Sequence, residues 1–459
     1  MKKFFRIKHV KSHHNNSDLH PVLTTFDLTL LGIGAIIGAG VFVLTGVAAA
    51  TKAGPAICLS YVLAGCAALF AALSYAELAS SVGGSGSAYG YAYTSVGELF
   101  AWIIGWALIL EYTVSVSTVA VGWSGYVLNG LSTLNINLPD YLSKGPGSGG
   151  IINLPAMLIV SLLIFFLCAG VRHSATLNMI IVIIKLLTIA FFIVIAAGNV
   201  KAENWVPFFP FGYDGVVKGA AIVFFAYIGF DALSTTAEET INPQRSLPIG
   251  IILSLVICTI IYIIVSILLT GIAHYTTLNN ASPVAYSLLS IGYPIATGIV
   301  SIGAIAGLTT VMLVMYFGLT RIIFAISRDG LLPKFFSKVN AKTKTPTNSI
   351  IFMGIVIALI AGLVPLSDLA ELVNIGTLTA FIFVCLGVII LRKQHPDLQR
   401  PFKLPLNPLI PSLGVILCVY LISNLSFVTW QRFSIWMIVG LVVYFIYGQF
   451  NSNLDKNNK

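Results

Sequence analysis

Charged residues are scarce in this sequence. They make up 9% of the 459 residues, whereas hydrophobic residues make up 57%. An ordinary soluble domain has about 25% charged and about 45–50% apolar residues. The shortage of charge excludes a soluble globular enzyme, a disordered protein and a nucleic-acid-binding protein. A β-barrel is also disfavoured, because the apolar runs are long and unbroken instead of alternating.

Catalytic and metal-binding motifs are missing as well. The sequence has no HExxH, GxSxG or Walker motif, and its six cysteines are scattered through apolar segments without a CxxC spacing. We therefore expect no enzyme activity, no cofactor and no metal site, and we expect the cysteines to be small buried residues. The first 25 residues are polar and basic and lack the apolar core of a signal peptide, so the first crossing should remain in the mature protein.

The sequence does contain many long apolar segments. A helix needs about 20 apolar residues to cross a bilayer. We predict twelve such segments, separated mostly by glycine, proline and polar residues: 26–50, 55–79, 97–130, 151–171, 174–198, 215–240, 247–273, 293–326, 347–365, 368–391, 408–428 and 431–450. The fold class predicted is an all-α polytopic membrane protein.

Basic residues indicate how these segments are oriented. They gather in the N-terminal tail (1–25), after the eighth segment and between the tenth and eleventh segments, and the C-terminal tail (451–459) adds two more. Lysine and arginine are enriched in cytoplasmic loops. We therefore predict an even number of crossings in the plasma (inner) membrane, with both termini in the cytoplasm.

Two segments contain glycine where a continuous helix would avoid it. Residues 32–40 (GIGAIIGAG) hold four glycines, each of which costs a helix about 1 kcal/mol relative to alanine. Residues 226–231 (AYIGFD) place a glycine beside an acid within the sixth segment. Interrupted helices at corresponding positions of two halves indicate a transporter binding site. The alternative is that the glycines only allow close helix packing.

Interrupted helices expose backbone groups that can bind a zwitterion. Free N–H groups at the start of a half-helix favour a carboxylate, and freed carbonyls favour an ammonium group. We predict that the N–H groups come from Gly38, Ala39 and Gly40. The carbonyls would come from Ile36 and from residues 225–228. An amino acid would then be held without any charged side chain.

Three ionisable residues lie well inside apolar segments: Glu111, Lys185 and Asp231. A charge at the centre of a membrane helix costs about 2.5–3.5 kcal/mol, so each is a functional candidate. Lys185 could bind and release a proton in every cycle, or it could form a permanent pair with carbonyls or a carboxylate. Glu111 could titrate or hydrogen-bond a neighbouring break. Asp231 could titrate or cap the second half of the sixth segment.

Charged residues also flank the predicted cytoplasmic end of the sixth segment. Glu238, Glu239 and Arg245 could form a gate or a solvated cluster. Residues 328–333 (RDGLLP) end the eighth segment as a helix stop and require no catalysis.

Several short motifs, taken together, resemble one transporter family. They are residues 32–42 (GIGAIIGAGVF), 75–78 (YAEL), 84–89 (GSGSAY), 110–112 (LEY), 229–231 (GFD), 238–239 (EE) and 328–330 (RDG). Spread over nearly the whole chain, this combination resembles the amino acid–polyamine–organocation (APC) superfamily. Within it, the sequence looks like the bacterial form of the cationic amino acid transporter branch.

The resemblance implies a LeuT-type fold, in which two inverted five-helix repeats precede two further helices. The repeats would be 26–200 and 214–391, and the last two helices would lie within 392–450. An amino acid would bind between the first and sixth segments, with its carboxylate at Gly38, Ala39 and Gly40. Its ammonium group would meet four carbonyls, those of Ile36, Phe225, Ala226 and Ile228.

The resemblance also bears on the coupling ion. Lys185 matches the lysine that, in proton-coupled members, stands where sodium-coupled relatives hold sodium. This match implies that a proton, and not sodium, is the coupling ion.

The substrate class follows from the eighth segment. A cationic side chain would need a dedicated carboxylate or carbonyl cluster, and this segment contains no acid. It places Met315 at about the depth of a bound side chain, which indicates a small or apolar pocket. This favours a broad range of amino acids or neutral ones, such as those of alanine size, over strict arginine or lysine uptake. Glu111 or Asp231 facing the pocket would reverse that preference and favour arginine or lysine.

The function predicted is secondary active transport of an amino acid by alternating access, with proton symport. An amino acid exchanger of the same fold and a strictly cationic transporter remain alternatives. A channel or a membrane-embedded enzyme is disfavoured, because the sequence offers one enclosed pocket and no catalytic groups. The lipid bilayer, the amino acid and the proton are the partners expected, and no oligomeric state is predicted.

Overall fold

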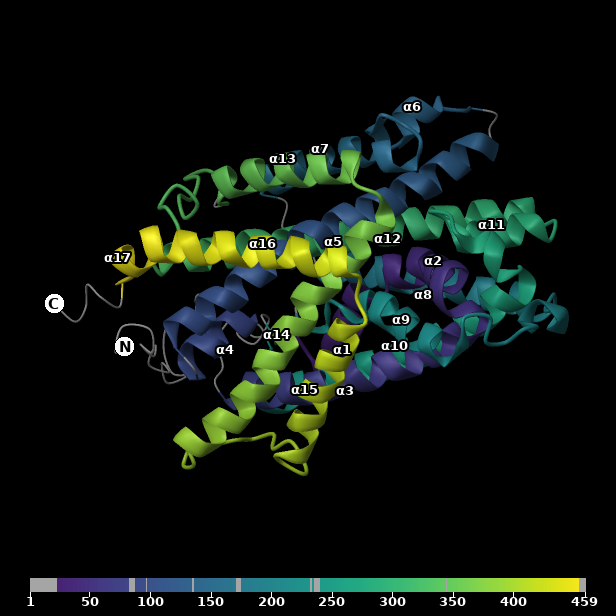
Figure 1. Ribbon diagram of the computed structural model, residues 1–459. Helices are drawn as coiled ribbons and strands as arrows, with labels where there is room; N and C mark the ends of the chain where they lie inside the picture. The colour runs from purple at the N-terminus through teal and green to yellow at the C-terminus, as the bar shows by residue number, and fades with distance from the viewer. Residues whose placement is uncertain are drawn as a thin grey trace.

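The chain folds almost entirely into helices (Figure 1). The computed structural model describes residues 23–81, 87–95, 97–133, 136–170, 175–231, 233–234, 240–343 and 345–453. The helices up to residue 205 are α1 (Thr25–Ile36), η1 (Gly40–Leu44), α2 (Thr45–Ala48), η2 (Ala49–Ala53), η3 (Gly54–Ala56), α3 (Ile57–Ser81), α4 (Ser87–Ser95), α5 (Glu98–Thr133), α6 (Asp140–Ser143), η4 (Pro146–Ser148), α7 (Leu154–Cys168), α8 (Ala175–Ala197) and η5 (Ala202–Trp205). A short strand, β1 (Ile152–Asn153), precedes α7.

The remaining helices follow from residue 212 onward. They are α9 (Gly212–Val223), η6 (Phe224–Tyr227), α10 (Pro243–Ile272), η8 (Tyr275–Leu278), α11 (Pro283–Ser290), α12 (Pro294–Arg328), α13 (Thr347–Leu363), α14 (Leu366–Gln394), α15 (Leu409–Ser423), α16 (Phe427–Val443), η9 (Tyr444–Gly448) and α17 (Gln449–Asn451). Each of the twelve predicted segments coincides with helical structure, which confirms the all-α class.

Membrane crossing is supported by the length and composition of these helices. Among the described residues, seven helical stretches are long and apolar enough to cross a bilayer. The first of them, Thr25–Ser81, turns back at Gly54, where φ is +62°, and so covers the first two predicted segments. Three shorter apolar helices, α7, α13 and α15, correspond to the fourth, ninth and eleventh segments. The chain is therefore a multi-pass membrane protein, and the number twelve stays a prediction.

Local sequence signals explain where several helices start. Thr24 and Asp27 form a reciprocal capping box at the start of α1: the Thr24 side chain accepts the Asp27 N–H, and the Asp27 carboxylate accepts the Thr24 N–H. Proline opens α10, α11 and α12, where its missing N–H removes no helical hydrogen bond.

Helices five segments apart in the predicted order pack against each other. The second and seventh segments meet as α3 and α10, and the third and eighth meet as α5 and α12. The fourth and ninth meet as α7 and α13, which lie side by side at the top of Figure 1. The first and sixth meet through η1 and η6. Each pair takes one helix from 26–200 and one from 214–391, and the division of the chain into two inverted repeats stays a prediction.

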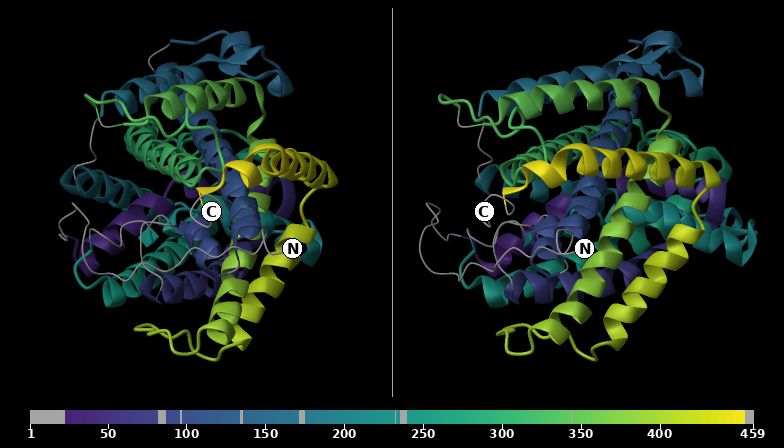
Figure 2. Two further views of the ribbon diagram at one scale, coloured as in Figure 1. Left: turned by 90° about the vertical axis from the view of Figure 1, so that its left-hand side faces the viewer. Right: turned by 60° about the vertical axis from the view of Figure 1, so that its left-hand side comes forward.

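The last helices lie at the edge of this bundle. In both views of Figure 2, α14 and α15 extend together beyond the other helices, and α16 crosses above them. Large apolar side chains are exposed on the outer helices, as contact with lipid requires; examples are Leu158, Leu187, Ile355, Ile416 and Ile438.

Three α-helices and two cysteines differ from the predictions. Helices α4, α6 and α11 occupy stretches that were predicted as connections, because the glycine, proline and polar residues around them are typical of loops. The cysteines were predicted to be buried, and four of them are; Cys66 is exposed on α3, and Cys168 at the end of α7 is partly exposed.

Candidate functional site

The first predicted segment is interrupted between α1 and η1. α1 ends at Ile36, and Ile37 has an extended conformation with ψ of 106°. The next helical turn begins where the Gly38 carbonyl accepts the Phe42 N–H at 3.3 Å. The N–H groups of Gly38, Ala39 and Gly40 precede that turn and are therefore outside its hydrogen-bond ladder. The predicted interruption is confirmed.

The sixth predicted segment is interrupted after η6. Ile228 is extended, with ψ of 139°, and Gly229 has φ of +115°, which glycine adopts without strain. A Cβ atom at Gly229 would lie 2.8 Å from the Ala35 carbonyl oxygen. Glycine is thus required both by the backbone conformation and by the closeness of α1.

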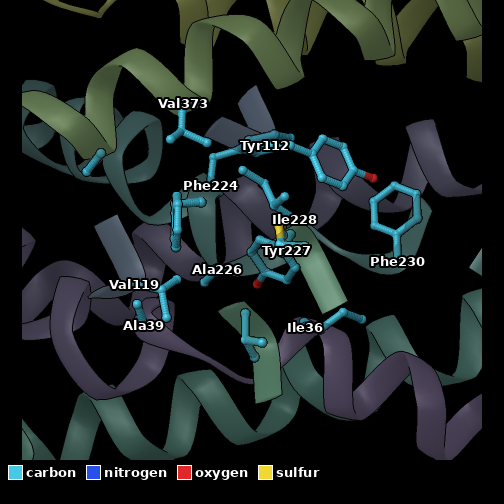
Figure 3. Close-up of a cluster of buried hydrophobic side chains, with 14 of the residues drawn as sticks. Ile36, Ala39, Tyr112, Val119, Phe224, Ala226, Tyr227, Ile228, Phe230 and Val373 are labelled. Carbon is cyan, nitrogen blue, oxygen red and sulfur yellow. The ribbon is translucent and has the colours of Figure 1, made fainter. Parts of the chain in front are cut away.

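The two interruptions touch each other. A Cβ atom at Gly40 would lie 2.3 Å from the Ala226 Cβ and 2.4 Å from its Cα. Figure 3 shows Ile36 and Ala39 from the first interruption in one cluster with Ala226 and Ile228 from the sixth segment. The residues predicted to bind the two ends of an amino acid are therefore brought together.

Two of the predicted carbonyls converge on a residue that the sequence did not reveal. The Tyr262 hydroxyl of α10 lies 2.8 Å from the Ile36 carbonyl oxygen and 2.9 Å from that of Ala226. A hydroxyl carries a single proton, so Tyr262 donates to one carbonyl at a time. The Phe225 carbonyl accepts the Ile228 N–H within the turn. A tyrosine within an apolar helix gives no sequence signal for such a role.

Lys185 holds the end of α1. It is 1% exposed, and its ammonium group donates hydrogen bonds to the carbonyl oxygens of Gly34, at 2.8 Å, and Ile37, at 3.2 Å. These carbonyls belong to the last turn of α1 and to the interruption itself, where helical partners are missing. Lys185 was expected either to pair permanently with carbonyls or to bind and release a proton. These hydrogen bonds are compatible with both roles.

The two carboxyl groups differ in their surroundings. Asp231 accepts a hydrogen bond from the Tyr112 hydroxyl at 3.1 Å and one from the Gly229 N–H at 3.3 Å. The predicted capping of the second half of the sixth segment stays a prediction, because most of the residues that follow Asp231 lie outside the described part of the chain. Glu111 is 1% exposed, and within the described residues neither carboxyl oxygen has a hydrogen-bond partner. The predicted hydrogen bond from Glu111 to a break is thus not formed.

A small cavity lies against the two interruptions. Its volume is about 10 Å³, close to the space that a single water molecule requires. Its lining consists of Ala35, Tyr112, Gly229, Val311, Val314 and Met315. Met315 is part of this lining, which includes no charged side chain, and its contact with substrate stays a prediction.

The predicted gate falls mostly outside the described part of the chain. Glu238 and Glu239 lie outside the described residues. Arg245 is exposed near the start of α10.

The comparisons with known proteins agree with this arrangement. A family model described as "Amino acid permease" matches residues 23–444. The chain belongs to the amino acid permease family. This permease is 52% identical to the branched-chain amino acid permease BcaP of Bacillus subtilis, over 95% of this chain and 94% of that protein. It is 46% identical to the methylthioribose transporter of the same organism, over 99% and 100%. It is 38% identical to the vacuolar cationic amino acid transporter 4 of Arabidopsis thaliana, over 86% and 68%. The family confirms the resemblance to APC transporters, so the permease is an amino acid transporter by family.

Proposed function

We propose that this permease is a proton-coupled symporter of small apolar amino acids that works by alternating access. The substrate binds where the interruption after α1 meets the interruption after η6. Its carboxylate takes the N–H groups of Gly38, Ala39 and Gly40, and its ammonium group takes the carbonyls of Ile36 and Ala226. Ile228 offers a further carbonyl.

The convergence of the Ile36 and Ala226 carbonyls carries this proposal. Both oxygens lie within 2.9 Å of the Tyr262 hydroxyl, although they belong to segments nearly 200 residues apart. In this state the Tyr262 hydroxyl occupies the position between the two carbonyl oxygens that an ammonium N–H group of the substrate would take. The cavity beside them is too small for an amino acid, so the state described is a closed one, and binding requires the two interruptions to separate.

Proton coupling is assigned to Lys185. A charged amine makes hydrogen bonds to carbonyls that are about twice as strong as those of a neutral amine. Loss of the proton therefore weakens the hydrogen bonds from Lys185 of α8 to the carbonyls of Gly34 and Ile37. Since Ile37 precedes the substrate-binding N–H groups, protonation and substrate binding act on the same few residues. Glu111 and Asp231 remain further candidates for proton coupling.

The preference for apolar substrates rests on the cavity and on one relative. Val311, Val314 and Met315 present apolar side chains beside the interruptions. Neither Glu111 nor Asp231 is among the residues that line the cavity, which supports neutral over cationic substrates. The relative named as a branched-chain amino acid permease transports substrates of this apolar class by its name.

A second candidate substrate is methylthioribose. One relative is named a methylthioribose transporter, and its similarity extends over nearly the whole of both chains. A cavity without charged side chains also suits a neutral thioether. Methylthioribose has no ammonium group, so it would leave the carbonyls of Ile36 and Ala226 without a charged partner. Amino acids are therefore the better match.

The test uses the purified permease in liposomes. An inward proton gradient should drive saturable uptake of labelled L-leucine or L-alanine, and sodium should have no effect. Unlabelled amino acids and methylthioribose then compete for uptake, and the strongest competitor identifies the class. Lys185→Ala should abolish accumulation against a gradient. Exchange of internal for external leucine that persists in wild type without any proton dependence would establish an exchanger in place of a symporter.

A further inference from the structure

A second and larger cavity lies away from the interruptions. Its volume is about 250 Å³, far more than the space that a single water molecule requires. It is partly open to the surface and is lined by Lys52 at the end of η2, by Lys218 and Ile222 of α9, by Glu371 of α14 and by residues 423–426 at the junction of α15 and α16. Figure 1 shows α15 leading through this short connection into α16. All of these elements lie on the side that the basic residues predict to be extracellular.

The cavity brings opposite charges together from three separate elements, η2, α9 and α14. Lys52 and Lys218 supply two ammonium groups, and Glu371 supplies a carboxylate. Lys218 also pairs with Asp214, one turn earlier in α9, but both side chains are about half exposed or more, and such pairs contribute little. Lys218 can therefore turn toward a ligand at small cost.

The Glu371 carboxylate has one oxygen engaged. In the described part of the chain, Oε2 accepts hydrogen bonds from the Ser426 hydroxyl and from the Thr429 hydroxyl, the latter at 2.8 Å. Oε2 also accepts the Ser426 N–H at 3.4 Å. These bonds fix the carboxylate at the start of α16 and leave Oε1 for a donor within the cavity.

This charge pattern selects for a zwitterion. A simple anion would be attracted by two lysines but repelled by Glu371, and a simple cation would meet the reverse. A molecule with an ammonium group and an anionic group a few ångströms apart satisfies both sets at once. A free amino acid has this chemistry, and so does the headgroup of phosphatidylethanolamine.

We infer that this cavity is a second, external amino acid site, which rests on the orientation and transport function proposed above. Its occupant would link Lys52 and Lys218, next to the two interrupted segments, to Glu371 on α14. The same elements are already joined one turn deeper, where the Asn374 amide donates to the carbonyls of Ala221 and Ile222 at 2.6 and 2.8 Å. A ligand that binds only this closed arrangement shifts the population toward it. Excess external substrate therefore slows transport.

The test counts bound amino acids and follows the rate of uptake. Wild-type permease in nanodiscs of phosphatidylglycerol should bind two equivalents of labelled L-leucine at saturation, and uptake into liposomes should fall at high external leucine. Glu371→Gln should bind one equivalent and lose the inhibited phase, while uptake at low leucine stays unchanged. Glutamine keeps an oxygen that can accept the Ser426 and Thr429 bonds. Lys52→Gln, which leaves that cap untouched, should have the same effect.

The matched control is Glu203→Gln. Glu203 is an exposed carboxylate of η5 on the same predicted side and does not line the cavity. This variant should keep two equivalents. The inference is overturned if wild type takes up leucine but binds a single equivalent, or if Glu371→Gln and Lys52→Gln still bind two. A wild type that neither binds nor takes up leucine overturns the proposed function, and this inference with it.

A second arm separates the two sources of the zwitterion. The titration is repeated in nanodiscs that contain phosphatidylethanolamine. Two equivalents in both lipids establish the free amino acid as the ligand. If the lipid removes the second equivalent from wild type, the headgroup is the stronger ligand and the assignment to an amino acid is overturned.

Discussion

Gly40 and Ala226 lie in direct contact, so that a Cβ atom at Gly40 would come within 2.3 Å of the Ala226 Cβ. The contact joins the two interrupted helices at the point where substrate is proposed to bind. Because of this contact, the space between the two interrupted helices is too small for an amino acid in this state. Opening the site means separating these two residues, and closing it means restoring the contact.

The first prediction is that Gly40→Ala impairs transport. The added methyl group meets both the side chain and the backbone of Ala226, and overpacking of this kind costs about 1–3 kcal/mol. Closure should become unfavourable, so leucine uptake should fall about tenfold or more. Gly298→Ala is the control, because a Cβ atom at Gly298 of α12 meets nothing within 4 Å. Normal uptake by Gly40→Ala at equal amounts in the membrane would contradict the proposed closure.

The second prediction concerns Tyr262→Phe. Removing the hydroxyl leaves the carbonyls of Ile36 and Ala226 without their shared donor in the closed, empty state. A hydrogen bond contributes about 1 kcal/mol, so the balance between empty and loaded states should shift and the KM for leucine should change about fivefold. Tyr316→Phe is the control, because that buried hydroxyl donates to the Ile350 carbonyl instead. An unchanged KM would show that the two carbonyls do not take part in binding.

The sequence predicted the interruptions and Lys185 for definite physical reasons. Four glycines within residues 32–40 are too costly for an ordinary helix, and a lysine within an apolar run is costly in a membrane. Tyr262 could not be predicted in this way. Its role exists only because α10 brings one hydroxyl to carbonyls of two other segments, and that meeting depends on tertiary packing.

The same limit explains the other differences. Asp231 was recognised as an intramembrane acid, but its donors, Tyr112 and the Gly229 N–H, follow from how α5 meets the interruption. Helix α4 was overlooked because the glycines at 83–86 are typical of a loop. The external cavity was not predicted either, because Lys52, Lys218 and Glu371 are unremarkable in the sequence until the fold assembles them.

The third prediction is that Met315→Ala broadens the substrate range. Met315 is 6% exposed and lines the cavity beside the interruptions, so shortening it enlarges the space for a substrate side chain. A difference of a few methylene groups in an apolar pocket changes discrimination by about 1–3 kcal/mol. Competition by phenylalanine relative to alanine should therefore rise about tenfold or more.

Met353→Ala is the matched control for this change. Met353 of α13 is equally buried, at 6% exposed, but does not line the cavity. Its removal should leave the ratio of phenylalanine to alanine unchanged. An identical shift in both variants would mean that Met315 acts through general loosening and not through the substrate pocket.

The fourth prediction concerns stability at the start of α5, where the C-terminal helices contact the bundle. Glu98 is 1% exposed, and its carboxylate accepts hydrogen bonds from the hydroxyls of Tyr93, Tyr444 and Ser452 at 3.1, 3.0 and 2.6 Å. Glu98→Ala removes the acceptor that these three hydroxyls share, which should destabilise the fold by roughly 3 kcal/mol. Ser452→Ala removes a single donor and should cost about 1 kcal/mol or less.

Thermal unfolding of the detergent-solubilised permease measures both effects. Glu98→Ala should lower the midpoint by several times the shift of Ser452→Ala, because it removes the acceptor that all three hydroxyls share. Glu203→Ala, which changes an exposed carboxylate, should leave the midpoint in place. Equal midpoints for Glu98→Ala and wild type would mean that the three hydroxyls find other acceptors, and that Glu98 does not join the C-terminal helices to α5.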